Sequence, residues 1–357
     1  MVTSIKERIA RYRRFYSAKK GLMTIVQAPS SADRAAISQS PRFDSVDWSS
    51  EPSVRNYARI EAENFLAATA GFETLDDDTV PILQVLAGTG MIAAAFVKDP
   101  VLHQESDTNY LVPPIPTWDV CPDRIGFDPD NLYYRAQMFI LREYIDRFGD
   151  RRFILPFTHF GPLDLVNQFR GNDIFYDFSE SPEELRALLS RSTDAILELE
   201  AHVRRNHMAG YEPEGMAVGG WFPAGTYLSC DIGDMISGDL LRAFELPYVE
   251  RILSKWGGAF MHHHELGLHQ IPTWTGCAGL SVQFLNRDPN TRHLGDMADE
   301  GIIAHSRRLP ISFLCTADEY VRNCDRWAEG RFIIAVDCGS RKEAEELVRL
   351  AEKFRPY

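Results

Sequence analysis

Short runs of consecutive apolar residues, separated by amphipathic segments, recur along most of this sequence and constrain its fold more than any other feature. Near-continuous apolar runs are typical of strands in a parallel sheet that is buried on both faces. The strong candidates are residues 80–88, 151–161, 215–222, 257–264, 280–285, 309–315 and 331–338, and the weaker ones are 22–28 and 108–115. Strands that alternate with helices over this length predict a parallel α/β fold.

Helix-start signals stand between these runs. A Ser or Thr followed three residues later by Glu is the capping-box pattern, and Pro is favoured in the first helical turn. The signals are carried by Ser181, Pro182 and Glu184, by Thr316 with Glu319, and by Ser340 with Glu343. The last two pairs follow predicted strands within two residues. We therefore expect short strand-to-helix connections in the C-terminal part of the fold.

Two parallel architectures suit this alternation, namely a (β/α)8 barrel and an open doubly wound sheet. No G-x-G-x-x-G motif follows any predicted strand, so the main motif for a dinucleotide-binding open sheet is missing. We therefore predict an α/β fold with a single TIM-type (β/α)8 barrel over residues 76–357. Residues 1–75 are predicted to form an N-terminal helical extension packed on that barrel. In such barrels the chemistry lies at the C-terminal ends of the strands.

The charge balance and the cysteines limit the partners and the compartment. A net charge of −13 argues against a nucleic-acid or anionic-membrane surface. No apolar run approaches the length of about 18 residues that a membrane span needs, and the N-terminal residues lack the apolar core of a secretory signal. The six cysteines are scattered without a CxxC pair. Reduced thiols and a cytoplasmic location are expected.

The stretch "GGAFMHHHELGLHQ" at 257–270 carries four of the ten histidines. Because side chains alternate along a strand, His262 and His264 share one face and His263 takes the other. The last predicted strand carries Cys338 to the same end of the fold. Two imidazoles and a thiol suit Zn²⁺ and leave its fourth position open, as in catalytic sites. The alternative is that each histidine is a hydrogen-bonded loop residue at a strand end and that the cysteine packs in the core as a small hydrophobic residue.

Other polar or aromatic residues fall near predicted strand ends and are candidates for a pocket. His159 and Asp231 are candidate acid–base groups, and Trp221 and Tyr227 are candidate cofactor-binding walls. For each of them alone, capping, loop hydrogen bonding or ordinary packing is the competing interpretation. His202 and His207 lie on or after a long predicted helix and are expected to face solvent.

Several segments resemble the uroporphyrinogen decarboxylase superfamily. The most telling is "CDIGDMISGDLLRAFELPYVERILSKWGGAFMHHHE" at 230–265, in which an aspartate, a turn and a Leu-Pro-Tyr helix precede a strand that ends in histidine. The segments 161–189, 309–324 and 330–340 resemble the family's middle part and its last two strand–helix units. The resemblance covers about residues 80–350 and implies a TIM-type barrel.

The superfamily contains two well-known chemistries, and the residues favour one of them. The cofactor-free decarboxylases use an Arg-rich N-terminal motif that is absent here. Zinc-dependent methyltransferases move a methyl group between a corrinoid protein and a thiol, and hold zinc through His-x-Cys and a later Cys. Those positions fall on His262, His264 and Cys338. The resemblance thus implies a zinc methyltransferase or demethylase with a small-molecule substrate and a corrinoid protein as partner.

This sequence departs from the methyltransferase pattern at two positions. His264 stands where the family has cysteine, and Glu265 stands where it has glycine, so Glu265 is a candidate fourth ligand or general base. Ether, amine and alcohol substrates stay open as alternatives to a thiol. A metal-free lyase that uses Asp231 or His159, and a non-catalytic ligand-binding barrel, are the rival functions. A homodimer is one option for the oligomeric state.

Overall fold

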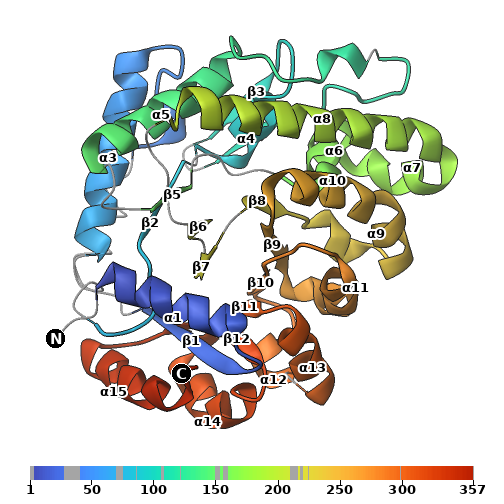
Figure 1. Cartoon of the computed structure of the whole chain (residues 1–357). Helices are drawn as coiled ribbons and strands as arrows, with labels where there is room; N and C mark the ends of the chain where they lie inside the picture. The colour runs from blue at the N-terminus through green and yellow to red at the C-terminus, as the bar shows by residue number, and fades with distance from the viewer. Residues whose placement is uncertain are drawn as a thin grey trace.

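The computed structural model describes most of the 357-residue chain. The described residues are 4–27, 41–69, 75–85, 87–105, 108–120, 122–148, 153–155, 160–209, 216–217, 220–223, 225–297 and 299–356. Figure 1 shows strands on the inside of the molecule and helices around its periphery. The predicted α/β class is therefore confirmed.

A six-stranded parallel sheet runs in the order β1–β12–β11–β10–β9–β8. Its strands are β1 (Gly21–Gln27), β8 (Thr226–Ser229), β9 (Ala259–His264), β10 (Val282–Asn286), β11 (Ile311–Thr316) and β12 (Arg331–Asp337). The weak candidate at 22–28 is thus a strand of this sheet, paired along its whole length with β12. The region predicted as a helical extension, 1–75, contributes a strand as well as helices.

A second parallel pair consists of β2 (Ile82–Gln84) and β5 (Phe153–Leu155). Among the described residues no strand ladder joins this pair to β1 or to β8, so the sheet is not closed into the predicted barrel. Backbone and side-chain hydrogen bonds of Asp77 and Asp78, just before β2, bridge the gap between β2 and β1. The Asp78 N–H donates to the Thr24 carbonyl at 2.9 Å, and the Asp78 and Asp77 carboxylates accept from the N–H groups of Thr24 and Val26.

Two antiparallel pairs differ from the predicted parallel strands. The weak run at 108–115 contributes β4 (Asn109–Leu111), which pairs with β3 (Leu102–Gln104). The run at 215–222 divides into β6 (Met216–Ala217) and β7 (Trp221–Phe222). Gly220, with φ of +121°, allows the backbone conformation just before β7. The strand that enters the main sheet is therefore β8, which the apolar pattern did not predict.

Helices cover the outside of the strands (Figure 1). They are α1 (Ile5–Ser17), α3 (Glu51–Thr69), α4 (Thr89–Ala94), α5 (Leu132–Phe148), α6 (Pro162–Arg170), α7 (Ile174–Glu180), α8 (Pro182–Asn206), α9 (Gly238–Phe244), α10 (Leu246–Trp256), α11 (Ile271–Gly276), α12 (Leu294–Met297), α13 (Glu300–Arg308), α14 (Ala317–Trp327) and α15 (Arg341–Ala351). Over the described ranges, no helix combines the length and the apolar character that crossing a membrane requires.

The predicted helix starts are reproduced with one exception. The capping box at Thr316 forms in full, and the Ser340 hydroxyl accepts the N–H of Glu343. Pro182 begins α8, but the Ser181 side chain makes no cap hydrogen bond. The connections from β11 to α14 and from β12 to α15 are short, as expected, and this keeps the strand ends close to the following helix starts.

Alternate residues of β12 belong to two different cores. Phe332, Ile334 and Val336 pack in the core that also contains side chains of α14 and α15. Ile333 packs in a separate core with Tyr12 of α1 and Trp221. This division follows from the alternation of side chains along a strand, and it decides which residues near the strand ends face the interior.

Candidate metal centre

The three consecutive histidines of β9 separate as the strand alternation predicts. His262 and His264 lie on one side of the strand, with their Nε2 atoms 3.3 Å apart. His263 lies on the other side and is fully buried, with Nδ1 3.3 Å from Asp234 Oδ1 and its ring near Trp274. The contact between His263 and Asp234 is an ion-pair distance without hydrogen-bond geometry. Only the first and third histidines therefore face the candidate site.

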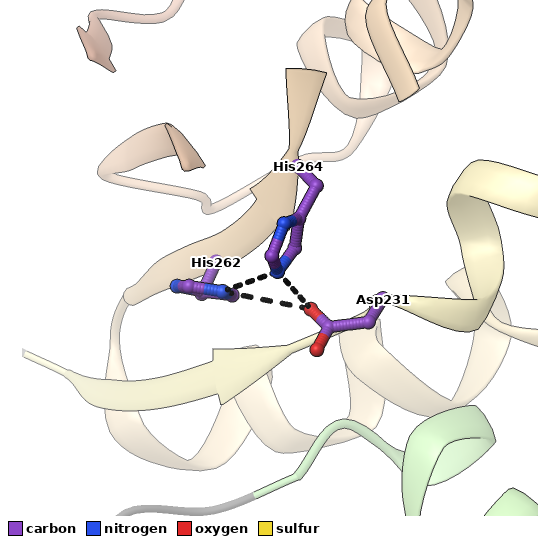
Figure 2. A group of neighbouring side chains, drawn as sticks. All are labelled: Asp231, His262 and His264. Carbon is purple, nitrogen blue, oxygen red and sulfur yellow. Dashed lines mark hydrogen bonds and ion pairs between the residues drawn. The ribbon is translucent and has the colours of Figure 1, made fainter. Parts of the chain in front are cut away.

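Asp231 completes a compact group with these two histidines, shown in Figure 2. It follows the end of β8, the strand next to β9, and begins the 3-10 turn Ile232–Met235. Its Oδ1 atom lies 3.6 Å from His262 Nε2 and 3.7 Å from His264 Nε2. We call these three residues the ligand triangle. Adjacent parallel strands bring them together because their C-terminal ends lie at the same edge of the sheet.

The ligand triangle fits a tetrahedral zinc ion. Two imidazole nitrogens and one carboxylate are a known catalytic zinc set with one open position. Zinc bonds of about 2.0–2.1 Å place tetrahedral ligands about 3.3–3.4 Å apart, whereas an octahedral ion with similar bonds places neighbouring ligands about 2.9–3.0 Å apart. The observed separations of 3.3, 3.6 and 3.7 Å match the tetrahedral case better.

Asp288 orients one of the two histidines. It follows β10, and its Oδ1 lies 2.8 Å from His264 Nδ1 while its Oδ2 accepts the Leu266 N–H at 3.1 Å. When Nδ1 donates to this carboxylate, the lone pair of His264 Nε2 faces the triangle. A carboxylate behind a metal-binding histidine is a common arrangement that fixes its tautomer. Asp234 adds a second restraint by accepting the His264 backbone N–H at 2.7 Å.

A buried aspartate at the start of α6 holds the Asp231 loop in place. Asp164 accepts the Ser229 hydroxyl at 2.6 Å and the backbone N–H groups of Asp231 and Ile232 at 2.9 and 3.0 Å. These bonds fix the backbone on both sides of Asp231. Neither Asp234 nor Asp288 was among the candidates predicted from the sequence, although both lie near strand ends.

Desolvation and the neighbouring charged groups shift the pKa values of all three residues of the triangle. Partial desolvation of Asp231, whose side chain still reaches solvent, and the nearby Asp164 carboxylate raise the pKa of Asp231 to about 8. Burial and the neighbouring His264 lower the pKa of His262 to about 3. Burial opposes protonation of His264, but its hydrogen bond with Asp288 and the Asp231 charge raise its pKa overall. A divalent cation between these groups would relieve the carboxylate repulsion and use the neutral His262 nitrogen.

The structure does not place Cys338 with the histidines. Its side chain is 3% exposed and packs in the same core as Val336 and Ala344, with Sγ 3.7 Å from the Val336 carbonyl. The alternation along β12 explains this placement, because Cys338 continues the series of residues that face α14 and α15. Asp337, one residue earlier, is exposed. The candidate ligand set therefore changes from two histidines and a thiol to two histidines and the carboxylate of Asp231.

Glu265 also points away from the triangle. It is buried, and its carboxylate accepts the Leu294 N–H at 2.8 Å and lies 2.8 Å from His293 Nδ1. These contacts occupy both oxygens, so Glu265 connects the end of β9 to the start of α12. Glu265 therefore has a structural role, and it does not lie with the histidines as the candidate ligand or general base predicted from the sequence.

The remaining candidates lie in three different places. Tyr227 stacks on Phe260 with ring centroids 5.4 Å apart and lies 6.2 Å from the His262 ring, so it forms a wall beside the triangle. Trp221 is buried against Tyr12 and packs with α1, in the core described for Ile333. His159 lies outside the described residues.

Comparisons with known proteins bear on the fold. No family model matches the chain, and a search of curated proteins finds no match. Among solved structures, a methyltransferase from Methanosarcina mazei matches with a TM-score of 0.61 at 11% sequence identity, over 98% of this chain and 99% of that chain. At this identity the similarity shows a shared fold, and that fold spans essentially the whole of both chains.

Proposed function

We propose that this protein is a zinc-dependent methyl-transfer enzyme whose metal is held by His262, His264 and Asp231. The observation that carries the proposal is the convergence of three zinc-type donor atoms within 3.7 Å of one another at the ends of two adjacent strands. The similarity to a methyltransferase over the full length of the chain supports this class of reaction. A TIM-type barrel of the uroporphyrinogen decarboxylase superfamily is the proposed complete fold.

Zinc in such a site supplies a Lewis acid that lowers the pKa of a group in its open position. The protein's residues provide the geometry for it. Asp288 fixes the tautomer of His264, and Asp164 fixes the loop that carries Asp231. The Asp231 side chain is 52% exposed, so the triangle is open to small molecules on that side. Tyr227 and Phe284 provide aromatic walls beside His262.

The charge of the ligand set suggests the substrate class. One carboxylate and two neutral imidazoles leave Zn²⁺ with a net charge of +1, whereas a histidine and two thiolates leave it neutral. A more positive centre stabilises harder, oxygen- or nitrogen-centred anions and weakens the nucleophilicity of a bound thiolate. We therefore propose an oxygen- or nitrogen-linked methyl group as the substrate, with a corrinoid, free or on a partner protein, as the other methyl carrier.

The experiment combines metal analysis with a methyl-transfer assay on protein purified without a His-tag. We expect about one zinc per chain, and conversion of cob(I)alamin to methylcobalamin with one of three donor classes: an aryl methyl ether, a methylamine or methanol. His264→Ala abolishes both signals, and Asp239→Ala, an exposed matched aspartate on α9, changes neither. Methyl transfer that is unaffected by zinc removal would exclude the proposal. Release of CO₂ from a carboxylic acid by zinc-free protein would favour the lyase alternative.

A further inference from the structure

A cavity on the helical shell carries an unusual share of this acidic chain's positive charge. It has a volume of about 310 Å³ and lies where α3 and α5 meet the C-terminal end of α8. Figure 1 shows α5 and α8 across the top of the molecule and α3 down its left side, away from β9. Its polar lining consists of Glu51, Arg55, Arg135, Arg142, His202 and His207. We call it the shell pocket.

Two of its arginines have no acidic partner. Arg135 and Arg142 are seven residues apart on α5, close to two full turns, so they lie on the same side of the helix. Across the described part of the chain, neither guanidinium makes an ion pair or a side-chain hydrogen bond. Arg55, in contrast, is engaged by Glu51 at 2.8 Å and Glu143 at 3.3 Å. The pocket therefore retains positive charge even though Glu51 lines it.

The third side of the pocket is aromatic and contains an unsatisfied donor. Tyr134 is 1% exposed, and its hydroxyl has no hydrogen-bond partner within the described structure. Its ring packs edge-on against His202 and His207, with centroids 5.7 and 6.0 Å away. The two histidines were expected to face solvent, but both are partly buried. Burial lowers the pKa of each histidine, helped by Arg205 for His202 and by His202 and Arg142 for His207. Both rings are therefore neutral near pH 7.

We infer that the shell pocket binds a small planar anion, an aromatic ring that carries a carboxylate or a phosphate. The two guanidinium groups without acidic partners provide the fork geometry that oxyanions favour. The partly buried rings of His202, His207 and Phe139 provide apolar contact for the ring of the ligand. The volume is at the lower end of small-molecule sites, which limits the ligand to one ring and one anionic group. This inference is independent of the proposed zinc chemistry.

Isothermal titration of the full chain with four probes tests this assignment. Benzoate and phenyl phosphate share the ring and distinguish the two anions, while inorganic phosphate lacks the ring and benzyl alcohol lacks the charge. We expect saturable binding of benzoate or phenyl phosphate, and at least tenfold weaker binding of the other two probes. Equal binding of inorganic phosphate would overturn the aromatic part of the assignment, and saturable binding of benzyl alcohol alone would overturn the anionic part.

Variants show whether binding takes place in the shell pocket. Arg135→Gln with Arg142→Gln is expected to weaken binding at least tenfold, whereas Arg349→Gln with Lys353→Gln, two exposed cations near the C-terminus, removes the same charge without effect. Equal loss in the two double variants, or no loss in either, would overturn the assignment.

Discussion

The Nε2 atoms of His262 and His264 face each other at 3.3 Å, and the two residues are two positions apart on the same face of β9. Two neutral imidazole nitrogens at this distance direct their lone pairs toward each other unless a proton or a cation lies between them. The Asp231 carboxyl group lies 3.6 and 3.7 Å from the same two atoms. This geometry is the basis of the proposed zinc site, and four of the predictions below follow from it.

Zinc removal is expected to destabilise the protein. Because an ion that binds only the folded state stabilises it by mass action, zinc at 100 times its dissociation constant contributes about 2.7 kcal/mol, or roughly 3–4 °C in Tm for a chain of this length. Thermal unfolding before and after chelation measures the difference. His262→Ala should have the Tm of the chelated wild-type protein both before and after chelation. A Tm of this variant that still rises with zinc would contradict the assigned ligands.

Asp288→Asn is expected to weaken zinc binding without removing it. The substitution replaces the carboxylate that fixes the tautomer of His264, and such changes typically cost 10- to 100-fold in metal affinity. Competition with a chromogenic chelator measures the affinity. Asp239→Asn, on an exposed side chain of α9, is the matched control. Equal zinc affinity in the two variants would show that Asp288 does not act through His264.

Zinc affinity is expected to rise with pH up to about 8. The pKa of Asp231 in the metal-free protein is raised to about 8 by burial and by Asp164, so below this pH a proton must leave before zinc binds. Affinity then rises by up to about tenfold for each pH unit and levels off above pH 8. The same shift means that proton binding stabilises the metal-free fold at low pH and that this contribution is lost as the pH rises through 8. Chelator competition between pH 6 and 9 tests the first effect, and an affinity that is flat over this range would contradict it.

Cys338→Ala is expected to leave zinc binding intact. Its thiol packs beside Val336 and Ala344 in the core below α15, so the variant should lose about 1 kcal/mol of stability through the missing contacts. Zinc stoichiometry and denaturant unfolding provide the two measurements. Loss of zinc in this variant, with stability unchanged, would restore the ligand set expected from the sequence resemblance.

Arg8→Met is expected to destabilise the fold strongly. The Arg8 guanidinium is buried and donates to Asp77 at 3.0 Å and to the carbonyls of Leu75 and Thr79, which ties α1 to the segment that bridges β1 and β2. Removing one member of a buried ion pair typically costs about 3–5 kcal/mol. Lys6→Met on the exposed side of α1 controls for the loss of a charge. Urea unfolding measures both, and a loss below about 1 kcal/mol for Arg8→Met would contradict the buried role.

Local patterns in the sequence were sufficient for the α/β class and for part of the site. The apolar runs located β9, β10, β11 and β12, because a strand buried on both faces needs a continuous apolar run. Strand alternation separated His263 from His262 and His264, because successive side chains leave a strand on opposite sides. These inferences need only neighbouring residues, and for that reason they agree with the structure.

Only the tertiary structure decided which residue joins the two histidines. Cys338 and Asp231 both follow strands. The sequence alone does not show which face of β12 corresponds to the His262 face of β9, and its apolar pattern does not locate β8. Sheet pairing aligns His262 with Phe284 and Ser312, and through them with Ile333, which places Cys338 on the opposite face. The end of β8 lies directly beside His262, so Asp231 is the residue that lies with the two histidines. Register between strands depends on contacts far apart in the chain, which a reading of consecutive residues does not contain.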